Sequence, residues 1–278
     1  MKKVLLSLLL ISSLFSQANR ILTLAPTSQV SSIGNVTLPY MNPARNLFKK
    51  DEFSFSKVNW MTNIVNDMNY NFINFDRGEY GLNILFFNYG DQLIADETGI
   101  VDGQFSPSSA VYGFNYARKV SKFNLGLDVK FITHDLLLNK AKGFILGVGG
   151  YFPKVYKDLD VDVMLQNFGM APKFGGVKSE LPTSLNIGFS YPYKDWMLYG
   201  QNNFHKDYYT FGSGVSYNYK NMLWGKAGYY GDLDHELLYP TFGLDFKYDK
   251  YLIGMSYIYG NRELPLSNTI RLTINLEL

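Results

Sequence analysis

The chain contains no cysteine. This absence excludes a disulfide framework and any metal site built from thiolate ligands. Stability must therefore come from buried apolar surface or from a lipid environment. That situation is ordinary for outer-membrane proteins and less so for small secreted domains.

A long apolar segment is missing as well. No stretch after the N-terminus holds 18 consecutive apolar residues, so a transmembrane helix is excluded. The apolar stretch near the start, residues 4–15, is too short for a bilayer core that needs about 20 residues. Two lysines precede it, and Ser16-Gln17-Ala18 follows with small residues where a signal peptidase cleaves. Residues 1–18 are therefore predicted to be a secretory signal peptide, removed after export by the Sec pathway.

Neither sign of charge is in excess. The sequence has 26 Lys and Arg against 24 Asp and Glu, and loss of residues 1–18 removes two of the lysines. The exported chain is then formally neutral. Nucleic-acid binding needs a basic surface that neutralises phosphates, so no nucleic-acid partner is predicted.

Histidine is scarce, and no catalytic constellation is present. His134, His205 and His235 share no metal-ligand spacing, and we interpret them as loop or interface residues. The serines have no neighbouring base that would activate them as nucleophiles. The sequence therefore predicts a protein that is not an enzyme and holds neither a metal nor a cofactor.

Three aspartates imitate the start of a calcium-binding loop at Asp158, Asp160 and Asp162. The pattern fails at the sixth position, where Val163 replaces glycine, and at the twelfth, where Gly169 replaces glutamate. We therefore interpret the aspartates as the polar face of a strand.

Aromatic residues are abundant instead. The chain has 22 Tyr and 21 Phe, an aromatic share of 17%, and 25 Gly. An exported chain with this much apolar surface and no spanning helix can cross a membrane only as a closed barrel. The sequence therefore predicts an all-β fold, a transmembrane antiparallel β-barrel in the outer membrane of a Gram-negative type cell.

The last ten residues show the barrel pattern most clearly. Even positions from 270 to 278 are aliphatic and odd positions from 269 to 277 are polar or charged, which gives a strand with one apolar and one polar face. The predicted lipid-facing residues are Ile270, Leu272, Ile274, Leu276 and Leu278, and the predicted lumen-facing residues are Arg271, Thr273, Asn275 and Glu277. This strand is expected to pair with the first, near residues 53–61, and to close the barrel.

From residue 51 onward, about fourteen short alternating segments are separated by turn residues. Met68, Tyr70 and Phe72 form the apolar face of the second segment, opposite asparagines. The polar faces, assigned inward, are rich in Asn, Gly, Ser, Asp and Lys, so a polar lumen is predicted. Glycine on these faces would let an interior plug or neighbouring side chains approach the wall closely. Residues 88–107 and 136–142 are predicted outer loops.

Residues 19–50 are not strand-like, because they are rich in Ser, Thr, Asn, Gly and Pro. We interpret them as a hatch that plugs the barrel or as a segment across its periplasmic end, with a disordered tail as the alternative. The predicted organisation is a signal peptide (1–18), a hatch or periplasmic segment (19–50) and a barrel (51–278).

Seven short motifs follow one another in a characteristic order: Asn42-Pro43-Ala44, Asn88-Tyr89-Gly90-Asp91, Tyr116-Ala117-Arg118-Lys119-Val120, Asn124-Leu125-Gly126-Leu127-Asp128-Val129-Lys130-Phe131, Leu165-Gln166-Asn167-Phe168-Gly169, Leu181-Pro182-Thr183-Ser184-Leu185 and Ser267-Asn268-Thr269-Ile270-Arg271-Leu272. No single motif is specific, but the ordered set resembles the PorV/PorQ family of outer-membrane barrels, which is related to the FadL-type fatty-acid transporters. The resemblance implies a fourteen-stranded barrel with Asn42, Pro43 and Ala44 in a hatch that occludes the lumen. The chain departs from the family in its short leading segment and in ending on Leu278 rather than on an aromatic residue.

The resemblance also implies a function. Its leading form is an accessory of type IX-like protein secretion, whose outer loops and rim dock exported proteins through their C-terminal signal domain. The alternative is a FadL-like conduit for long-chain fatty acids or other hydrophobic small molecules, and the third hypothesis is a structural barrel without transport activity. A polar lumen disfavours the conduit. The expected partners are outer-membrane lipid and either secreted proteins or a hydrophobic small molecule.

Overall fold

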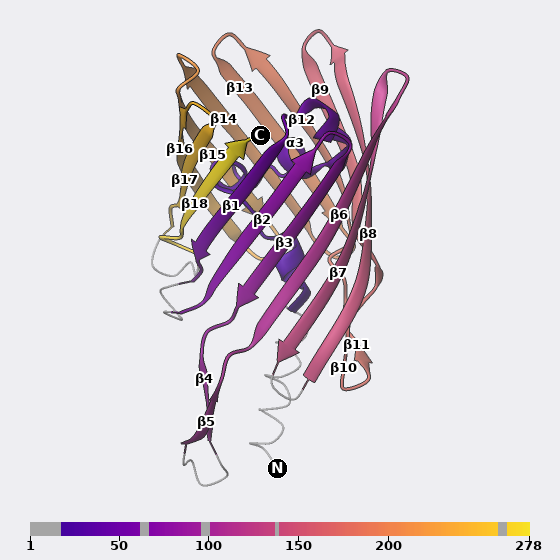
Figure 1. Cartoon of the computed structure of the whole chain (residues 1–278), viewed down its shortest axis with the longest axis vertical. Coiled ribbons are helices and arrows are strands. Elements are labelled where there is room, and N and C mark those ends of the chain that lie inside the picture. Colours follow the sequence, from indigo (N-terminus) through magenta and orange to yellow (C-terminus); the bar gives the residue numbers. More distant parts are fainter. Residues whose placement is uncertain (1–17, 62–66, 96–100, 137–138, 261–265) are drawn as a thin grey trace.

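Fourteen antiparallel strands form a closed barrel in the computed structural model, which describes residues 18–61, 67–95, 101–136, 139–260 and 266–278 (Figure 1). The barrel strands are β1 (Glu52–Asn59), β2 (Asn69–Arg77), β3 (Tyr80–Asn88), β6 (Ser108–Val120), β7 (Phe123–Leu136), β8 (Asn139–Tyr156), β9 (Leu159–Met170), β12 (Ser184–Tyr193), β13 (Trp196–His205), β14 (Tyr209–Tyr219), β15 (Leu223–Asp232), β16 (Leu237–Tyr248), β17 (Tyr251–Ile258) and β18 (Ile270–Glu277). The predicted fold class and the number of strands are confirmed.

The last strand closes the barrel on the first. β18 pairs with β1 from Glu52 opposite Glu277 to Val58 opposite Arg271, and on its other edge with β17. Closure removes the unpaired strand edges that a membrane interior does not tolerate. The predicted pairing of these two strands is therefore confirmed.

The two ends of the barrel differ. At one end, which we call the turn end, residues 78–79, 121–122, 157–158, 194–195, 220–222 and 249–250 join neighbouring strands in tight turns. Each of these turns contains at least one residue with positive φ, as tight hairpin turns require. The opposite end, the loop end, carries the longer connections. Two of these contain small hairpins, β4 (Gln92–Ala95) with β5 (Val101–Phe105) and β10 (Lys173–Phe174) with β11 (Val177–Lys178).

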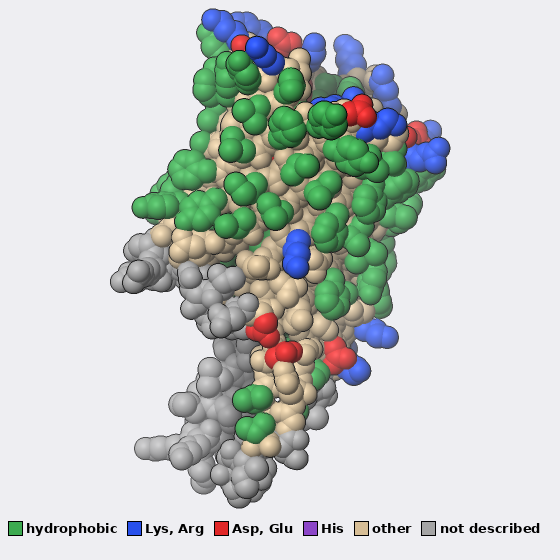
Figure 2. Space-filling model, turned by 60° about the vertical axis from the view of Figure 1, so that its left-hand side comes forward, with side chains coloured by type: hydrophobic (Ala, Val, Ile, Leu, Met, Phe, Trp, Pro, Cys, Tyr) green, Lys and Arg blue, Asp and Glu red, His purple; other side chains and the backbone are tan. Residues whose placement is uncertain are grey.

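The outer surface is a broad apolar belt. Outward-facing side chains such as Phe53 and Phe55 on β1 and Ile253 and Met255 on β17 are exposed. Figure 2 shows hydrophobic side chains covering the face of the barrel wall in view, with Lys and Arg concentrated at the turn end and further charged side chains toward the loop end. An apolar band bordered by charged groups is typical of a barrel that crosses a bilayer. No helix in the described part of the chain is long and apolar enough to span a membrane.

The N-terminal segment, residues 19–50, runs inside the barrel (Figure 1). It contains the short helices η1 (Ala18–Thr23), α2 (Ser28–Ser31), α3 (Leu38–Met41) and η2 (Pro43–Phe48). α2 packs on β16, β17 and β18, α3 on β9 and β12, and η2 on β3, β6, β7 and β8. The segment begins at the loop end, where the Asn19 side chain donates to the carbonyl of Glu180, and leads at the turn end directly into β1.

Glycines on the inner wall make room for this segment. A Cβ at Gly126 would clash with the backbone of Ala44, and a Cβ at Gly149 with the Asn42 side chain. The same holds at Gly214 and Gly228, which lie against Ile33, at Gly243 against Ser32 and at Gly254 against Ser28. The expectation that inward glycines allow close approach of an interior segment is confirmed.

Two expectations about the inner face are wrong, namely that the polar face of every strand points inward and that the lumen is polar. Tyr70 and Phe72 on β2 are buried inside the barrel, while Asn71 faces outward. Leu85 and Phe87 on β3 are also buried inside. The prediction of a polar lumen is therefore wrong toward the loop end, where the inner faces of β2 and β3 are apolar. Hydropathy cannot tell the two faces of a strand apart where both faces meet apolar surroundings.

Candidate functional site

A charged clamp fixes the turn-end part of the N-terminal segment. The Arg45 guanidinium donates to both carboxylate oxygens of Asp162 on β9, with Nη2 2.6 Å from Oδ2 and Nε 2.9 Å from Oδ1. The Asn42 side chain caps η2 by accepting from the Ala44 amide at 3.1 Å. Its Nδ2 donates to Asp162 at 2.9 Å and to the carbonyl of Gly150 at 3.0 Å. The clamp satisfies polar groups that burial would otherwise leave unpaired.

The middle of the segment is attached to the wall by a small number of hydrogen bonds. The Ser28 amide donates to Thr273 Oγ1 at 2.8 Å, and the Gly34 amide donates to Thr241 Oγ1 at 3.0 Å. The Leu38 amide donates to Gln201 Oε1 at 2.8 Å. Side chains of three different strands, β18, β16 and β13, thus hold the backbone of the segment.

The segment lies between two cavities. The loop-side cavity has a volume of about 730 Å³ and is lined by loop-end residues such as Trp60 and Tyr89. The turn-side cavity has a volume of about 570 Å³ and is lined by turn-end residues such as Lys194 and Lys250. Met41 and Phe72 line both cavities, so they form part of the wall that separates them.

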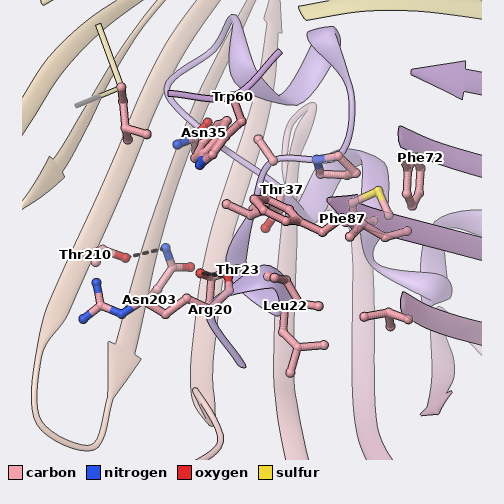
Figure 3. Close-up of a pocket in the computed structure, with 18 of the residues that line it drawn as sticks. Arg20, Leu22, Thr23, Asn35, Thr37, Trp60, Phe72, Phe87, Asn203 and Thr210 are labelled. Atoms are coloured by element: carbon pink, nitrogen blue, oxygen red, sulfur yellow. Dashed lines mark hydrogen bonds between the residues drawn. The ribbon is translucent and has the colours of Figure 1, made fainter. Parts of the chain in front are cut away.

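One wall of the loop-side cavity is apolar. Figure 3 shows Leu22, Trp60, Phe72 and Phe87 pointing into it from the N-terminal segment and from strands β1 to β3. The rings of Trp60 and Tyr70 meet edge to face at 5.4 Å, and those of Tyr70 and Phe87 stack at 5.8 Å. The buried apolar cluster behind this wall comprises Ile21, Val58, Trp60, Tyr70, Phe72, Leu85, Phe87, Val111, Ile132 and Ile145. This arrangement offers an apolar molecule a preformed place to bind.

The opposite wall is polar but uncharged along most of its length. Gln201 donates to Asn203 at 2.6 Å. Asn203 in turn donates to Thr210 at 2.9 Å, as drawn in Figure 3. Tyr208 lies in the connection between β13 and β14, and burial raises the pKa of its hydroxyl, which therefore stays protonated at neutral pH. The cavity thus joins an apolar wall to a wall of hydrogen-bonding groups.

The turn-side cavity is charged. Its ion pairs are Lys49 with Asp76 at 3.5 Å, Lys247 with Glu277 at 2.9 Å, and Lys226 with Asp245. A cavity of this kind suits water and ions better than an apolar molecule.

The closing strand meets both cavities in turn. Arg271 lines the loop-side cavity, Thr273 binds the N-terminal segment, and Asn275 and Glu277 line the turn-side cavity. The aliphatic residues between them, Ile270, Leu272 and Ile274, are exposed on the outer belt, with Leu276 half-buried and Leu278 exposed at the end of the chain. Of the hatch motif, Asn42, Pro43 and Ala44 are all buried inside the barrel against the wall.

Of the two expected settings for His134, a loop or an interface, the structure shows an interface, between β7 and the N-terminal segment. His134 lies buried on the inner face of β7, 2.6 Å from Ser109 Oγ and 3.2 Å from the Asn19 side chain. His205 stacks on Tyr208, and His235 contacts Asp232. The described residues contain no group of three or more acidic or histidine side chains that could hold a metal ion.

The apolar wall was missed at the sequence level, although one signal for it was present. Ile84, Leu85, Phe86 and Phe87 follow one another on β3, so both faces of this strand end are apolar. One face contributes to the outer belt and the other lines the cavity. A run of this kind inside an otherwise alternating barrel indicates an apolar lumen.

These features define a class: a closed transmembrane β-barrel whose lumen is divided by its own N-terminal segment, with an apolar cavity on the loop side. Solved structures with this fold include the toluene transporter TodX of Pseudomonas putida, with a TM-score of 0.56 and 12% identity over 90% of this chain and 96% of TodX. The Ralstonia pickettii toluene transporter TbuX has a TM-score of 0.54 and 12% identity over 90% and 96% of the two chains. The monoaromatic hydrocarbon channel CymD has a TM-score of 0.59 and 10% identity over 91% and 97%.

At these identities the similarity concerns the fold. No family model and no curated protein matches the chain.

Proposed function

We propose that the chain is an outer-membrane conduit that takes up a hydrophobic small molecule through its loop-side cavity. The observation that carries this proposal is the apolar wall formed by Trp60, Phe72, Leu85, Phe87 and Val111. A structural barrel needs no such cavity, because its lumen can be filled by side chains. The expectation of a wholly polar lumen, which disfavoured the conduit, no longer stands.

The two barrel ends support a direction of uptake. Outer-membrane barrels carry short turns on the periplasmic side and longer loops on the outside. The loop-side cavity would then open toward the cell surface and the turn-side cavity toward the periplasm. In this arrangement the outer belt contacts lipid, residues 1–18 are removed on export, and residues 19–50 act as the hatch.

The fold similarity to toluene transporters and a monoaromatic hydrocarbon channel is consistent with an apolar cargo. Passage from one cavity to the other requires the N-terminal segment to shift. Its middle part is held by a small number of hydrogen bonds to Thr273, Thr241, Gln201 and Tyr239, which together are far weaker than the strand pairing of the barrel.

Binding can be tested with the tryptophans as reporters. Trp60 lines the loop-side cavity, whereas Trp196 is exposed on the outer belt. Variants that retain one or the other as the sole tryptophan would be placed in lipid nanodiscs and titrated with bromobenzene, an apolar quencher. Trp196 also borders the turn-side cavity, but that cavity is charged and the Trp196 side chain is exposed. We expect saturable quenching of Trp60 and linear quenching of Trp196, because of the two only Trp60 lines the loop-side cavity.

A matched pair of valines tests the site itself. Val111→Asn places an amide in the apolar wall and should weaken bromobenzene binding about tenfold, whereas Val177→Asn on the exposed β11 should leave it unchanged. Linear quenching of Trp60, or equal effects of the two substitutions, would refute the conduit.

The secretion-accessory hypothesis stays a prediction that rests on the sequence resemblance. One feature is compatible with it: Leu93 on β4 and Val177 on β11 expose apolar side chains in the loop-end hairpins. The test is co-isolation of exported proteins with the detergent-purified barrel from its native cells. The wild-type barrel is compared with the Leu93→Ser and Val177→Ser variants. Recovery of no exported protein would rule the hypothesis out.

A further inference from the structure

Three neighbouring hairpin turns at the turn end repeat one three-residue pattern. A tyrosine is the last residue of a strand, a lysine follows it in the turn, and Asp or Asn comes next: Tyr156-Lys157-Asp158, Tyr193-Lys194-Asp195 and Tyr219-Lys220-Asn221. The turns join β8 to β9, β12 to β13 and β14 to β15, and these strands follow one another around the barrel wall. The three lysines, which we call the lysine arc, therefore lie along one continuous part of the rim.

Each lysine of the arc has a backbone conformation that its residue type disfavours. The angle φ is +53° at Lys157, +55° at Lys194 and +54° at Lys220. Glycine and asparagine adopt this left-handed conformation readily, whereas a longer side chain is strained in it. A turn that needed only this shape would be more stable with Gly or Asn, so the lysine side chain itself calls for a reason.

The ammonium groups of the arc lie beside the outer belt. Each ammonium nitrogen lies over the ring of the preceding tyrosine, 5.4 Å from the ring centre of Tyr156, 5.5 Å from that of Tyr193 and 5.2 Å from that of Tyr219. These tyrosines belong to the outward faces of their strands, and each is at least half exposed. Of the three lysines, only Lys194 also borders the turn-side cavity. The cation–π contacts therefore direct the positive charges toward the surroundings of the barrel.

The lysine arc has no counter-ion in the described part of the chain. No carboxylate there lies within 4.0 Å of any of its ammonium groups, and Asp158 pairs instead with Lys154, at 3.5 Å. At the loop end, by contrast, the exposed Lys140 pairs with Asp135 at 2.9 Å. Figure 2 shows how Lys and Arg gather at the turn end. The charges of the arc are thus available to an anion outside the protein.

We propose that the lysine arc and its tyrosines bind the headgroups of anionic phospholipids in the leaflet that surrounds the turn end. Aromatic side chains of membrane barrels form girdles at the boundary between hydrocarbon and headgroups. Tyrosines at this depth place the lysines, one residue further along, level with the lipid phosphates. An anionic leaflet attracts basic side chains close to its surface, so the charges of arc and leaflet are complementary.

The experiment measures which lipids stay bound to the detergent-purified barrel. The protein is incubated with equal amounts of phosphatidylglycerol and phosphatidylcholine that carry identical acyl chains, and native mass spectrometry counts the bound molecules of each. Wild-type protein should enrich phosphatidylglycerol about fivefold, which corresponds to about 1 kcal/mol for one lysine at an anionic surface. Added salt should reduce the enrichment, because the lysines are exposed.

The test variant replaces all three lysines of the arc by asparagine: Lys157→Asn, Lys194→Asn and Lys220→Asn. Asparagine removes the charge and tolerates the left-handed conformation, so the turns should keep their shape and the barrel its heat-modifiable gel mobility. The enrichment of phosphatidylglycerol should disappear. Lys220→Asn alone should remove part of the enrichment, and this single substitution keeps the test decisive if the triple variant fails to fold.

A matched control removes three exposed lysines from the loop end: Lys140→Asn, Lys178→Asn and Lys206→Asn. This variant has the same net charge as the test variant, and it should keep the full enrichment. Equal loss of enrichment in the two triple variants would show that net charge rather than the arc selects the lipid, and it would overturn the proposal.

Two further outcomes would also overturn the proposal. One is equal retention of the two lipids by wild-type protein. The other is a test variant that keeps its lipid enrichment but loses binding to purified peptidoglycan sacculi, which would assign the arc to a polymer of the periplasm. Bromobenzene quenching of Trp60 should be the same in both triple variants, because none of the substituted residues lines the loop-side cavity. Failure of the lipid site and failure of the conduit are therefore distinguishable.

Discussion

The guanidinium of Arg45 and the carboxylate of Asp162 form a two-pronged ion pair that joins the N-terminal segment to the barrel wall. Asp162 is fully buried and lies on β9, far along the chain from Arg45. The pair sits beside the turn-end part of the segment, where the chain leaves the lumen for β1. It is therefore the contact whose loss should most directly release the segment.

Asp162→Ala should weaken attachment of the segment by about 3 kcal/mol, because it removes the bidentate partner of a largely buried guanidinium and leaves it only the more distant carboxylate of Asp160, at 3.8 Å. We expect larger and more frequent openings in single-channel recordings from planar bilayers, and faster trypsin cleavage after Arg45. The control is Asp158→Ala, which removes an exposed carboxylate paired only with Lys154. Equal conductance of the two variants would show that the ion pair does not hold the segment.

The glycines of β15 offer a test of close packing between segment and wall. Gly228 lies against the backbone of Ile33 and Gly34, whereas a Cβ at Gly225 would meet nothing within 4 Å. Gly228→Val should therefore displace the segment and raise conductance, while Gly225→Val on the same strand should not. Both variants should keep the heat-modifiable mobility of a folded barrel. If Gly228→Val does not raise conductance, the segment can move aside without opening the lumen, and its close contact with β15 is not what keeps the barrel closed.

The closing strand β18 could be predicted from the sequence alone. From Ile270 to Glu277 one face is aliphatic and the other polar, because one face meets the outer belt and the other meets polar groups of the lumen. Alternation then identifies the strand, its two faces and its place in the barrel. The wall glycines were predictable for the same reason, because inward glycines leave room for a close approach such as that of Ile33 at Gly228 or of the Asn42 side chain at Gly149.

The apolar cavity was beyond such reasoning. On β2, Tyr70 and Phe72 face the lumen, and the alternation of this strand looks the same whichever side is lipid. The cavity also depends on where residues 19–50 run, and that path is set by contacts such as Ser28 with Thr273 between distant parts of the chain. No local pattern encodes such a contact.

A lysine on the outward face of β18 should lower the free energy of unfolding more in the middle of the strand than at its end. Ile274 is exposed in the middle of the strand, and Leu278 is exposed at its end. Ile274→Lys should destabilise the barrel by about 2–4 kcal/mol, as expected for a lysine near the bilayer midplane, and Leu278→Lys by about 0–1 kcal/mol near the interface. Urea unfolding in lipid vesicles, followed by tryptophan fluorescence, measures both. Similar costs at the two positions would place Ile274 outside the hydrocarbon region.

The partition between the cavities should depend on Phe72. Phe72 is buried on the inner face of β2 and, with Met41, lines both the loop-side and the turn-side cavity. Truncation of a buried phenylalanine leaves a void and costs about 3–5 kcal/mol of local packing. Phe72→Ala should therefore connect the two cavities and speed the entry of small uncharged sugars in liposome-swelling assays.

The matched control for this truncation is Phe86→Ala on the neighbouring strand β3. Phe86 faces the outer belt, so its loss removes the same side chain without touching the lumen. Swelling should then stay at the wild-type rate. If Phe72→Ala also leaves swelling unchanged while Asp162→Ala increases it, the barrier is the N-terminal segment as a whole rather than the side chains at its edge. If neither variant increases swelling, the two cavities are not consecutive parts of one path, and the conduit would need a different exit.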